Sequence, residues 1–157
     1  MKEEDISCLA LALELARENV RKGGGPFGAV IVRDGQVIAA SANEVISIPD
    51  PTAHAEVQAI RKAAEALDSY DLSGTTLYTS CEPCPMCLGA IYWARISRVV
   101  FASDRFDAEK AGFRDAGLYR ELAMPSVERS LPVEQLKIPM TGREFEDWAD
   151  SGIRQDY

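Results

Sequence analysis

The sequence has few basic residues and no long apolar segment, and both shortages exclude classes of protein. Its 157 residues include 17 Lys and Arg against 25 Asp and Glu, a formal net charge of −8 at pH 7. A surface with that charge repels phosphate backbones, which argues against a nucleic-acid partner. No segment approaches the roughly 18 consecutive apolar residues of a membrane span. Met1 to Asp5 carries acids where a secretory signal needs basic and then apolar residues. We therefore expect a cytoplasmic chain without membrane contact.

Cysteine and histidine are also scarce, but they are unevenly placed. The chain has four cysteines and one histidine, and Cys81, Cys84 and Cys87 fall within seven residues. Thiols this close in sequence suit metal ligation better than disulfides, which indicates a reducing compartment. The fourth, Cys8, lies on an expected helix, and we interpret it as a packing residue.

Apolar periodicity predicts an α/β fold. Helices are expected from Ile6 to about Val20, from Asp50 to Leu67, and over 83–95, 108–122 and 143–149. Strands are expected over 27–32, 37–40, 75–80, 98–103 and 133–138. The first two strands form an antiparallel hairpin, whereas the strand, helix and strand from 75 to 103 imply parallel pairing. The sequence thus predicts one domain over 1–157, a three-layer α/β/α sandwich with a central mixed sheet of about five strands.

A glycine run follows the first helix. The apolar stripe of that helix is expected to comprise Ile6, Leu9, Leu13, Ala16 and Val20. The run Gly23 to Pro26 stops the helix and, with Gly28, matches the dinucleotide pattern G-x-G-x-x-G. A dinucleotide site needs a strand before the run and a helix after it, and here the order is reversed. We therefore interpret these glycines as a loop.

Metal-ligating residues stand at the expected starts of two helices. His54 lies in His54-Ala55-Glu56, and Cys84 and Cys87 lie in Pro83-Cys84-Pro85-Met86-Cys87. Two thiolates and one imidazole are good zinc donors, and the i, i+3 spacing puts both sulfurs on one helical face. Structural zinc sites close with four protein ligands, whereas catalytic sites keep a water in the fourth position. Three ligands therefore predict a catalytic zinc, with Glu56 as the neighbouring acid that moves protons.

Two other interpretations of these residues stay open. Cys84 and Cys87 match a redox dithiol, although that motif does not account for the His-x-Glu element. Cys81 with the three predicted ligands would make a closed Cys₃His site in a non-enzymatic structural module. We expect Cys81 to point elsewhere, because Pro83 and Pro85 separate the strand end from the helix start.

The combination H-x-E and P-C-x-x-C resembles the cytidine deaminase-like superfamily of zinc-dependent nucleobase deaminases. The resemblance covers about residues 5 to 125 and includes Thr52 to Glu56 and Cys81 to Ile91. It implies a three-layer α/β/α fold, one zinc ion per subunit held by His54, Cys84 and Cys87, and Glu56 as the catalytic residue.

Within the superfamily the chain most resembles the bacterial guanine deaminases. The stretches that carry this resemblance are Gly24 to Val30, Asp50 to Val57, Ile91 to Arg95 and Glu109 to Asp115. It implies hydrolysis of guanine to xanthine and ammonia, and it implies substrate contacts by Phe27, Asn43, the backbone around Ala55, Trp93 and Asp115. Alternatives with the same chemistry are a tRNA adenosine, cytosine or another aminopurine as substrate.

The same resemblance concerns the end of the chain. In that family the C-terminal segment crosses to the partner subunit, and a terminal aromatic closes the active site. For this sequence it implies a homodimer in which residues 139–157, a helix and a tail, are exchanged, and Tyr157 contacts the substrate.

Overall fold

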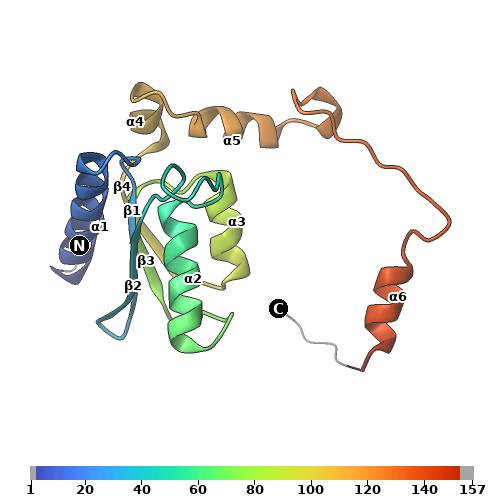
Figure 1. Cartoon of the computed structure of the whole chain (residues 1–157), viewed down its shortest axis with the longest axis horizontal. Helices are drawn as coiled ribbons and strands as arrows, with labels where there is room; N and C mark the ends of the chain where they lie inside the picture. The colour runs from blue at the N-terminus through green and yellow to red at the C-terminus, as the bar shows by residue number, and fades with distance from the viewer. Residues whose placement is uncertain (1–2, 153–157) are drawn as a thin grey trace. The chain divides into compact units, whose positions relative to one another are not determined.

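A four-stranded mixed sheet organises the first part of the chain (Figure 1). The chain divides into two units, Met1–Tyr119 and Arg120–Tyr157, and the computed structural model describes residues 3–152 of it. The sheet order is β2-β1-β3-β4, and its strands are β1 (Gly28–Arg33), β2 (Gln36–Ala42), β3 (Thr76–Cys81) and β4 (Arg98–Ser103). β1 pairs antiparallel with β2 and β3, whereas β3 and β4 are parallel, as predicted from their helical crossover.

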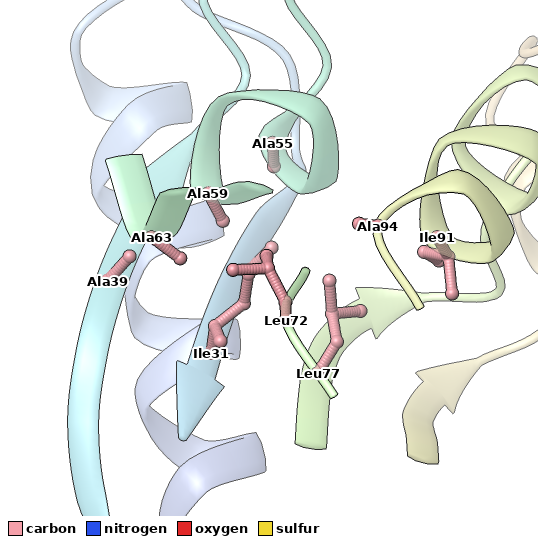
Figure 2. Close-up of a cluster of buried hydrophobic side chains, with 10 residues drawn as sticks. Ile31, Ala39, Ala55, Ala59, Ala63, Leu72, Leu77, Ile91 and Ala94 are labelled. Carbon is pink, nitrogen blue, oxygen red and sulfur yellow. The ribbon is translucent and has the colours of Figure 1, made fainter. Parts of the chain in front are cut away.

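Helices cover both faces of the sheet (Figure 1). The helices of this region are α1 (Glu3–Arg21), α2 (Ala55–Leu67), α3 (Pro85–Trp93), α4 (Arg105–Lys110) and α5 (Asp115–Ala123). Side chains alternate across a strand, so β1 turns Val30 and Val32 toward the cluster with Cys8 and Ala12 of α1. The other face of β1 packs against α2, and Figure 2 shows Ile31 among Ala55, Ala59 and Ala63 of that helix. The predicted three-layer α/β/α architecture is confirmed.

The buried stripe of α1 differs from the predicted one. Its buried residues are Asp5, Cys8, Ala12 and Ala16, whereas Ile6 and Val20 are 53% and 51% exposed. The reason is a close approach between helix and strand, since a Cβ added to Gly28 would lie 2.3 Å from the Ala12 carbonyl oxygen. Small side chains fit that interface better than large apolar ones. Cys8 packs in this core, as expected.

Two helix boundaries were predicted wrongly. α2 begins at Ala55 rather than near Asp50, because Asp50 Oδ1 accepts hydrogen bonds from the Thr52 backbone N–H and hydroxyl and forms a separate turn. The helix expected over 108–122 is two helices, α4 and α5. Gly112 separates them with a φ of 96°, a conformation that ends a helix.

The second unit contains the 3₁₀ helix η1 (Ser126–Glu128) and α6 (Arg143–Asp150). The predicted strand over 133–138 is wrong, since none forms between residues 120 and 152, and the sheet has four strands rather than five. A strand needs a backbone partner, and no strand in this unit supplies one. Leu136, for example, is 85% exposed.

Two predictions about the chain as a whole are not settled by these units. Residues 153–157, including Tyr157, lie outside the described part of the chain. The single domain over 1–157 and the exchange of 139–157 stay predictions. None of the helices in residues 3–152 has the length and apolar character that crossing a membrane requires.

Candidate active site

Three metal-ligating side chains meet at the starts of two helices. His54 and Cys84 are the N-cap residues of α2 and α3, and Cys87 lies in the first turn of α3. β3 ends three residues before Cys84, and Pro85 at the start of α3 suits the fixed backbone angle of a first helical turn. Both helix N-termini therefore direct partial positive charge toward the ligand atoms, which favours thiolate.

The distances between the three ligand atoms fit a zinc ion. His54 Nδ1 lies 3.6 Å from Cys84 Sγ and 3.5 Å from Cys87 Sγ, and the two sulfurs are 3.6 Å apart. Tetrahedral zinc, with bonds of about 2.3 Å to sulfur and about 2.0 Å to nitrogen, separates two sulfurs by about 3.8 Å and sulfur from nitrogen by about 3.5 Å. Among residues 3–152 these three side chains form the one group of at least three such donors that could hold a metal ion.

The electrostatics of the three donors also suit a cation. The hydrogen bond with Cys87, assisted by His54, lowers the pKa of Cys84 to about 4. The hydrogen bond between His54 and Cys84 raises the pKa of His54. The hydrogen bond between Cys87 and Cys84 raises the pKa of Cys87. One thiolate is thus already favoured without an ion, and a bound cation would favour the second.

Glu56 is the acid beside this group. It lies in the first turn of α2, is 5% exposed, and its Oε2 lies 3.5 Å from Cys87 Sγ. Thr79 of β3 donates a hydrogen bond of 3.3 Å to Oε1, which orients the carboxyl group. Burial raises the pKa of Glu56, so the group holds a proton more readily than an exposed glutamate. Such an acid suits proton transfer in both directions.

A cavity of about 260 Å³ adjoins these groups. It brings together six of the residues predicted for the site, namely Phe27, Asn43, His54, Glu56, Cys84 and Asp115. The remaining lining residues are Gly25, Val45, Ile46, Glu82 and Phe113. Its volume lies near the small end of the range for small-molecule sites, which is roughly 300–1,000 Å³.

Two polar side chains of the cavity wall, Asn43 and Asp115, are available to a ligand. Asn43 is 8% exposed, and its Oδ1 accepts a hydrogen bond from the Val45 backbone N–H, which leaves the amide nitrogen as the donor group. Asp115 begins α5, and burial raises its pKa. The cavity therefore offers an amide donor and a carboxyl group at different points of its wall.

The sequence matches the family model of the cytidine and deoxycytidylate deaminase zinc-binding region over residues 2–103. The chain belongs to this family. It is therefore a zinc-dependent hydrolytic deaminase, and zinc is its cofactor. The predicted membership is confirmed.

Individual relatives extend the comparison over the rest of this deaminase. The chain is 50% identical over 150 residues to a guanine deaminase from Bacillus subtilis, which covers 95% of this chain and 96% of the relative. The X-ray structure of guanine deaminase from that organism matches with a TM-score of 0.94 and 49% identity, covering 100% of this chain and 99% of the other. A guanine deaminase structure from Nitrosomonas europaea matches with a TM-score of 0.68 and 34% identity, over 76% of this chain and 72% of the other.

A second kind of relative acts on RNA. The chain is 42% identical over 110 residues to a tRNA-specific adenosine deaminase from Buchnera aphidicola, which covers 70% of this chain and 68% of the relative. The deaminase chemistry is thus shared between relatives named for a free base and for a tRNA.

Among the described residues, three predicted ones do not line the cavity of this deaminase, namely Cys87, Ala55 and Trp93. Trp93 ends α3, whose 9 residues extend about 13 Å from the ligand end, and it is 68% exposed. The side chain of Ala55 belongs to the apolar core, so only its backbone is available to a ligand (Figure 2). Tyr157 is not among the described residues.

Cys81 is not a fourth ligand in the described structure. It is 5% exposed, and its Sγ lies 3.6 Å from the Asp104 carbonyl oxygen, outside the group of three donors. Burial raises its pKa to about 11, which keeps the thiol protonated. The closed Cys₃His site is therefore not formed, as the two flanking prolines predicted.

Several contacts made by residues of the cavity wall were not predicted. The Phe113 ring packs edge-on against Phe27, with centroids 4.7 Å apart and an interplanar angle of 78°. Arg105 donates hydrogen bonds to both carboxylate oxygens of Glu82, and its guanidinium stacks 3.5 Å from the Tyr119 ring. Glu82 and Arg105 follow the parallel strands β3 and β4, and the carboxyl ends of parallel strands meet at one edge, which is the signal that could have indicated them.

Proposed function

We propose that this deaminase hydrolyses guanine to xanthine and ammonia. The observation that carries the proposal is the cavity itself, in which the zinc donors His54 and Cys84 and the acid Glu56 meet a wall that contains Phe27, Asn43 and Asp115. The similarity to a guanine deaminase from Bacillus subtilis over nearly the whole length of both chains supports the same substrate.

The zinc ligands in this proposal are His54, Cys84 and Cys87, with one ion per subunit. Zinc, when bound by three protein ligands, supplies an acidified water as nucleophile and polarises the reacting centre. The three side chains would hold the ion beside Glu56, because Cys87 contacts both His54 and Glu56.

Glu56 moves the protons. It accepts a proton from the attacking water at Oε2, the oxygen nearest Cys87, while a C–O bond forms at C2 of guanine. It delivers that proton to the ring nitrogen beside C2. It then takes the second proton, from the new hydroxyl group on C2, and delivers it to the amine, so the C2–N bond breaks, a C2 carbonyl forms and ammonia leaves. One water is consumed and no redox partner is needed.

The remaining residues orient the base. Guanine presents a ring N–H and an exocyclic amine as donors on one edge, and a carboxylate such as Asp115 accepts from both. The Asn43 amide nitrogen donates to a ring acceptor, the Phe27 ring packs on the base, and the backbone at Ala55 contacts it. Trp93 and Tyr157 stay predicted contacts, and this proposal does not depend on them.

Ammonia release over a panel of substrates tests the function. Wild-type protein is offered guanine, adenine, cytosine, 2,6-diaminopurine and a tRNA anticodon stem-loop, and we expect the largest kcat/KM for guanine. Glu56→Gln should keep its zinc and lose about 10²- to 10⁴-fold in kcat. Turnover of guanine by Glu56→Gln at the wild-type rate would rule out the mechanism, and preference for another substrate would rule out the assignment.

A tRNA adenosine is the second candidate substrate, because a tRNA-specific adenosine deaminase is also a close relative. An RNA enzyme needs basic side chains along its substrate groove, and the formal charge of −8 disfavours that. Apart from the zinc donors and Glu56, the ionisable residues that line the cavity are Glu82 and Asp115, and both are acidic. The stem-loop in the substrate panel distinguishes the two candidates directly.

The assembly and setting belong to the same proposal. The chain forms a homodimer that exchanges residues 139–157, works in the cytoplasm without a nucleic-acid or membrane partner, and serves guanine catabolism as one domain. All four cysteines are free thiols, which suits a reducing compartment. Several apolar side chains of residues 120–152 are exposed, including Val127 at 90% and Phe145 at 73%, and a partner subunit would cover them. Light scattering on purified protein should give twice the 17.2 kDa chain mass, and a monomer would contradict the exchange.

A further inference from the structure

One polar side chain ends the buried stripe of α1. The buried residues Asp5, Cys8, Ala12 and Ala16 follow helical spacing, and the next position on that face is Asn19. Asp5 is accounted for by an ion pair with Arg98. Asn19 is half-buried and does not line the cavity, so its place on the packed face needs another explanation.

The Asn19 side chain joins two segments that line the cavity. Its Nδ2 donates hydrogen bonds of 2.8 Å to the carbonyl oxygens of Gly25 and Asn43, which use both of its hydrogens. Gly25 precedes β1 and Asn43 follows β2, and both line the cavity. The Asn43 backbone N–H in turn donates to the Phe27 carbonyl oxygen at 3.0 Å, and the Phe27 N–H donates to Gly25 at 2.9 Å. Asn19 therefore anchors a small hydrogen-bonded cluster of Gly25, Phe27 and Asn43.

The glycine run is what allows this contact. The Gly23 N–H bonds to the Val20 carbonyl and the Gly24 N–H to the Asn19 carbonyl, with Gly23 at a φ of 85°, which is a Schellman motif at the end of α1. A Cβ added to Gly24 would lie 2.4 Å from Asn19 Nδ2. A side chain at position 24 would thus push the amide away from its acceptors.

We propose that Asn19 is a positioning residue of the base-binding wall. It holds Asn43 and Phe27 where they meet the base. Within residues 3–152 its side-chain amide bonds to Gly25 and Asn43 rather than to the zinc donors or Glu56. The identity of the base rests on the function proposed above, whereas the role of Asn19 does not. Base affinity then depends on Asn19, and zinc binding and the proton transfers do not.

Steady-state kinetics on two variants test this role. Asn19→Asp keeps the shape and removes both donors, and Asn19→Ala removes the side chain without adding charge. Both should raise KM for guanine about tenfold, with kcat within about threefold and an unchanged zinc content. Gly24→Ala should act in the same direction because it displaces the Asn19 amide.

Glu18→Gln, an exposed position on the same helix, is the matched control and should match wild type. An unchanged KM in Asn19→Ala would overturn the proposal. A raised KM in Asn19→Asp alone would also overturn it, because the added charge would then be the cause.

Binding and amide exchange separate this test from the proposed function. Hypoxanthine lacks the amine at C2 and cannot be deaminated, so its Kd by calorimetry reports the wall without chemistry and should rise about tenfold in Asn19→Ala. Hydrogen exchange at the Asn43 and Phe27 amides should be about tenfold faster in that variant, because their hydrogen-bonded cluster loses its anchor. Wild-type protein that leaves guanine intact would reject the proposed function, and the exchange rates would still decide the role of Asn19. The positioning role would be rejected if Asn19→Ala had the same amide hydrogen-exchange rates and the same Kd for hypoxanthine as wild type.

Discussion

At the scale of single residues, the site combines side chains that chemistry requires with side chains that hold them. His54, Cys84 and Cys87 have the ligand types and the separations that zinc needs. Glu56 is useful because Thr79 and Cys87 fix both of its carboxyl oxygens in a buried place. The side chains that hold the chemical groups act through those groups. Their loss should change the rate or the substrate affinity without removing the metal.

Replacement of Thr79 by valine tests this expectation for Glu56, the proposed proton carrier. The change removes the hydrogen bond to Glu56 Oε1 and keeps the shape, so we expect kcat to fall about tenfold with zinc content unchanged. Thr75→Val is the control, because the Thr75 hydroxyl is equally buried but bonds to the Leu72 carbonyl. That control should lose about 1 kcal/mol of stability and keep kcat. Equal kcat in wild type and Thr79→Val would show that Glu56 needs no such support.

Cysteine substitutions test the number of zinc ligands. Cys81→Ala should retain one zinc per chain by metal analysis, because its sulfur contacts the Asp104 carbonyl instead of the ligand group. Cys84→Ala should lose the metal, since a three-ligand site has no replacement donor. Loss of zinc from Cys81→Ala would restore the closed Cys₃His interpretation.

At the scale of secondary-structure elements, α3 is held at its ligand end by residues outside it. Tyr119 of α5 donates a 2.7 Å hydrogen bond to the Pro83 carbonyl, immediately before the ligand Cys84. Arg105 of α4 stacks on the Tyr119 ring and pairs with Glu82. Groups that orient a ligand typically change metal affinity by about 10- to 100-fold when removed.

Tyr119→Phe measures how far this support matters. The variant keeps the ring under Arg105 and loses only the hydroxyl, so we expect zinc affinity to fall about tenfold in competition with a chelator. Tyr92→Phe, at an exposed position of α3, is the control and should bind zinc like wild type. If Tyr119→Phe binds zinc as tightly as Tyr92→Phe and wild type do, the segment at Pro83 is held in place without the Tyr119 hydroxyl.

At the scale of the whole molecule, acidic groups paired in the folded state make stability depend on pH. Hydrogen bonds from the Ser73 side chain, from the Ser73 backbone N–H and from Arg95 lower the pKa of the Asp71 carboxyl group from 3.8 to about 2. The folded state therefore favours the ionised form. Its contribution is present above the ordinary pKa of 3.8 and is lost as the pH falls toward 2.

A urea titration at several pH values checks this sign. Asp71→Asn should lower the unfolding midpoint at neutral pH, and its difference from wild type should shrink as the pH falls from about 5 to about 2. Asp68→Asn, an exposed neighbour, controls for the loss of one surface charge. A difference that stays constant over that range would show that ionisation of Asp71 is not the cause.

The sequence by itself determined the parts that depend on near neighbours. The apolar periodicity placed four strands and most helices, and the spacings in His54-Ala55-Glu56 and Cys84 to Cys87 predicted three donor side chains that the structure does bring together. Side-chain periods and ligand spacings are local properties, so a pattern of a few residues is enough to state them. The same reasoning failed for the strand over 133–138, because an apolar run does not say whether a partner strand is present.

Tertiary structure alone decided the contacts between distant segments. Thr79 meets Glu56 across 23 residues, Tyr119 meets Pro83 across 36, and Asn19 meets Asn43 across 24. The buried face of α1 also depended on its close packing against Gly28 rather than on its most apolar stripe. These contacts arise only when packing brings separate elements together, and packing depends on the shapes of all the side chains at an interface rather than on any local pattern.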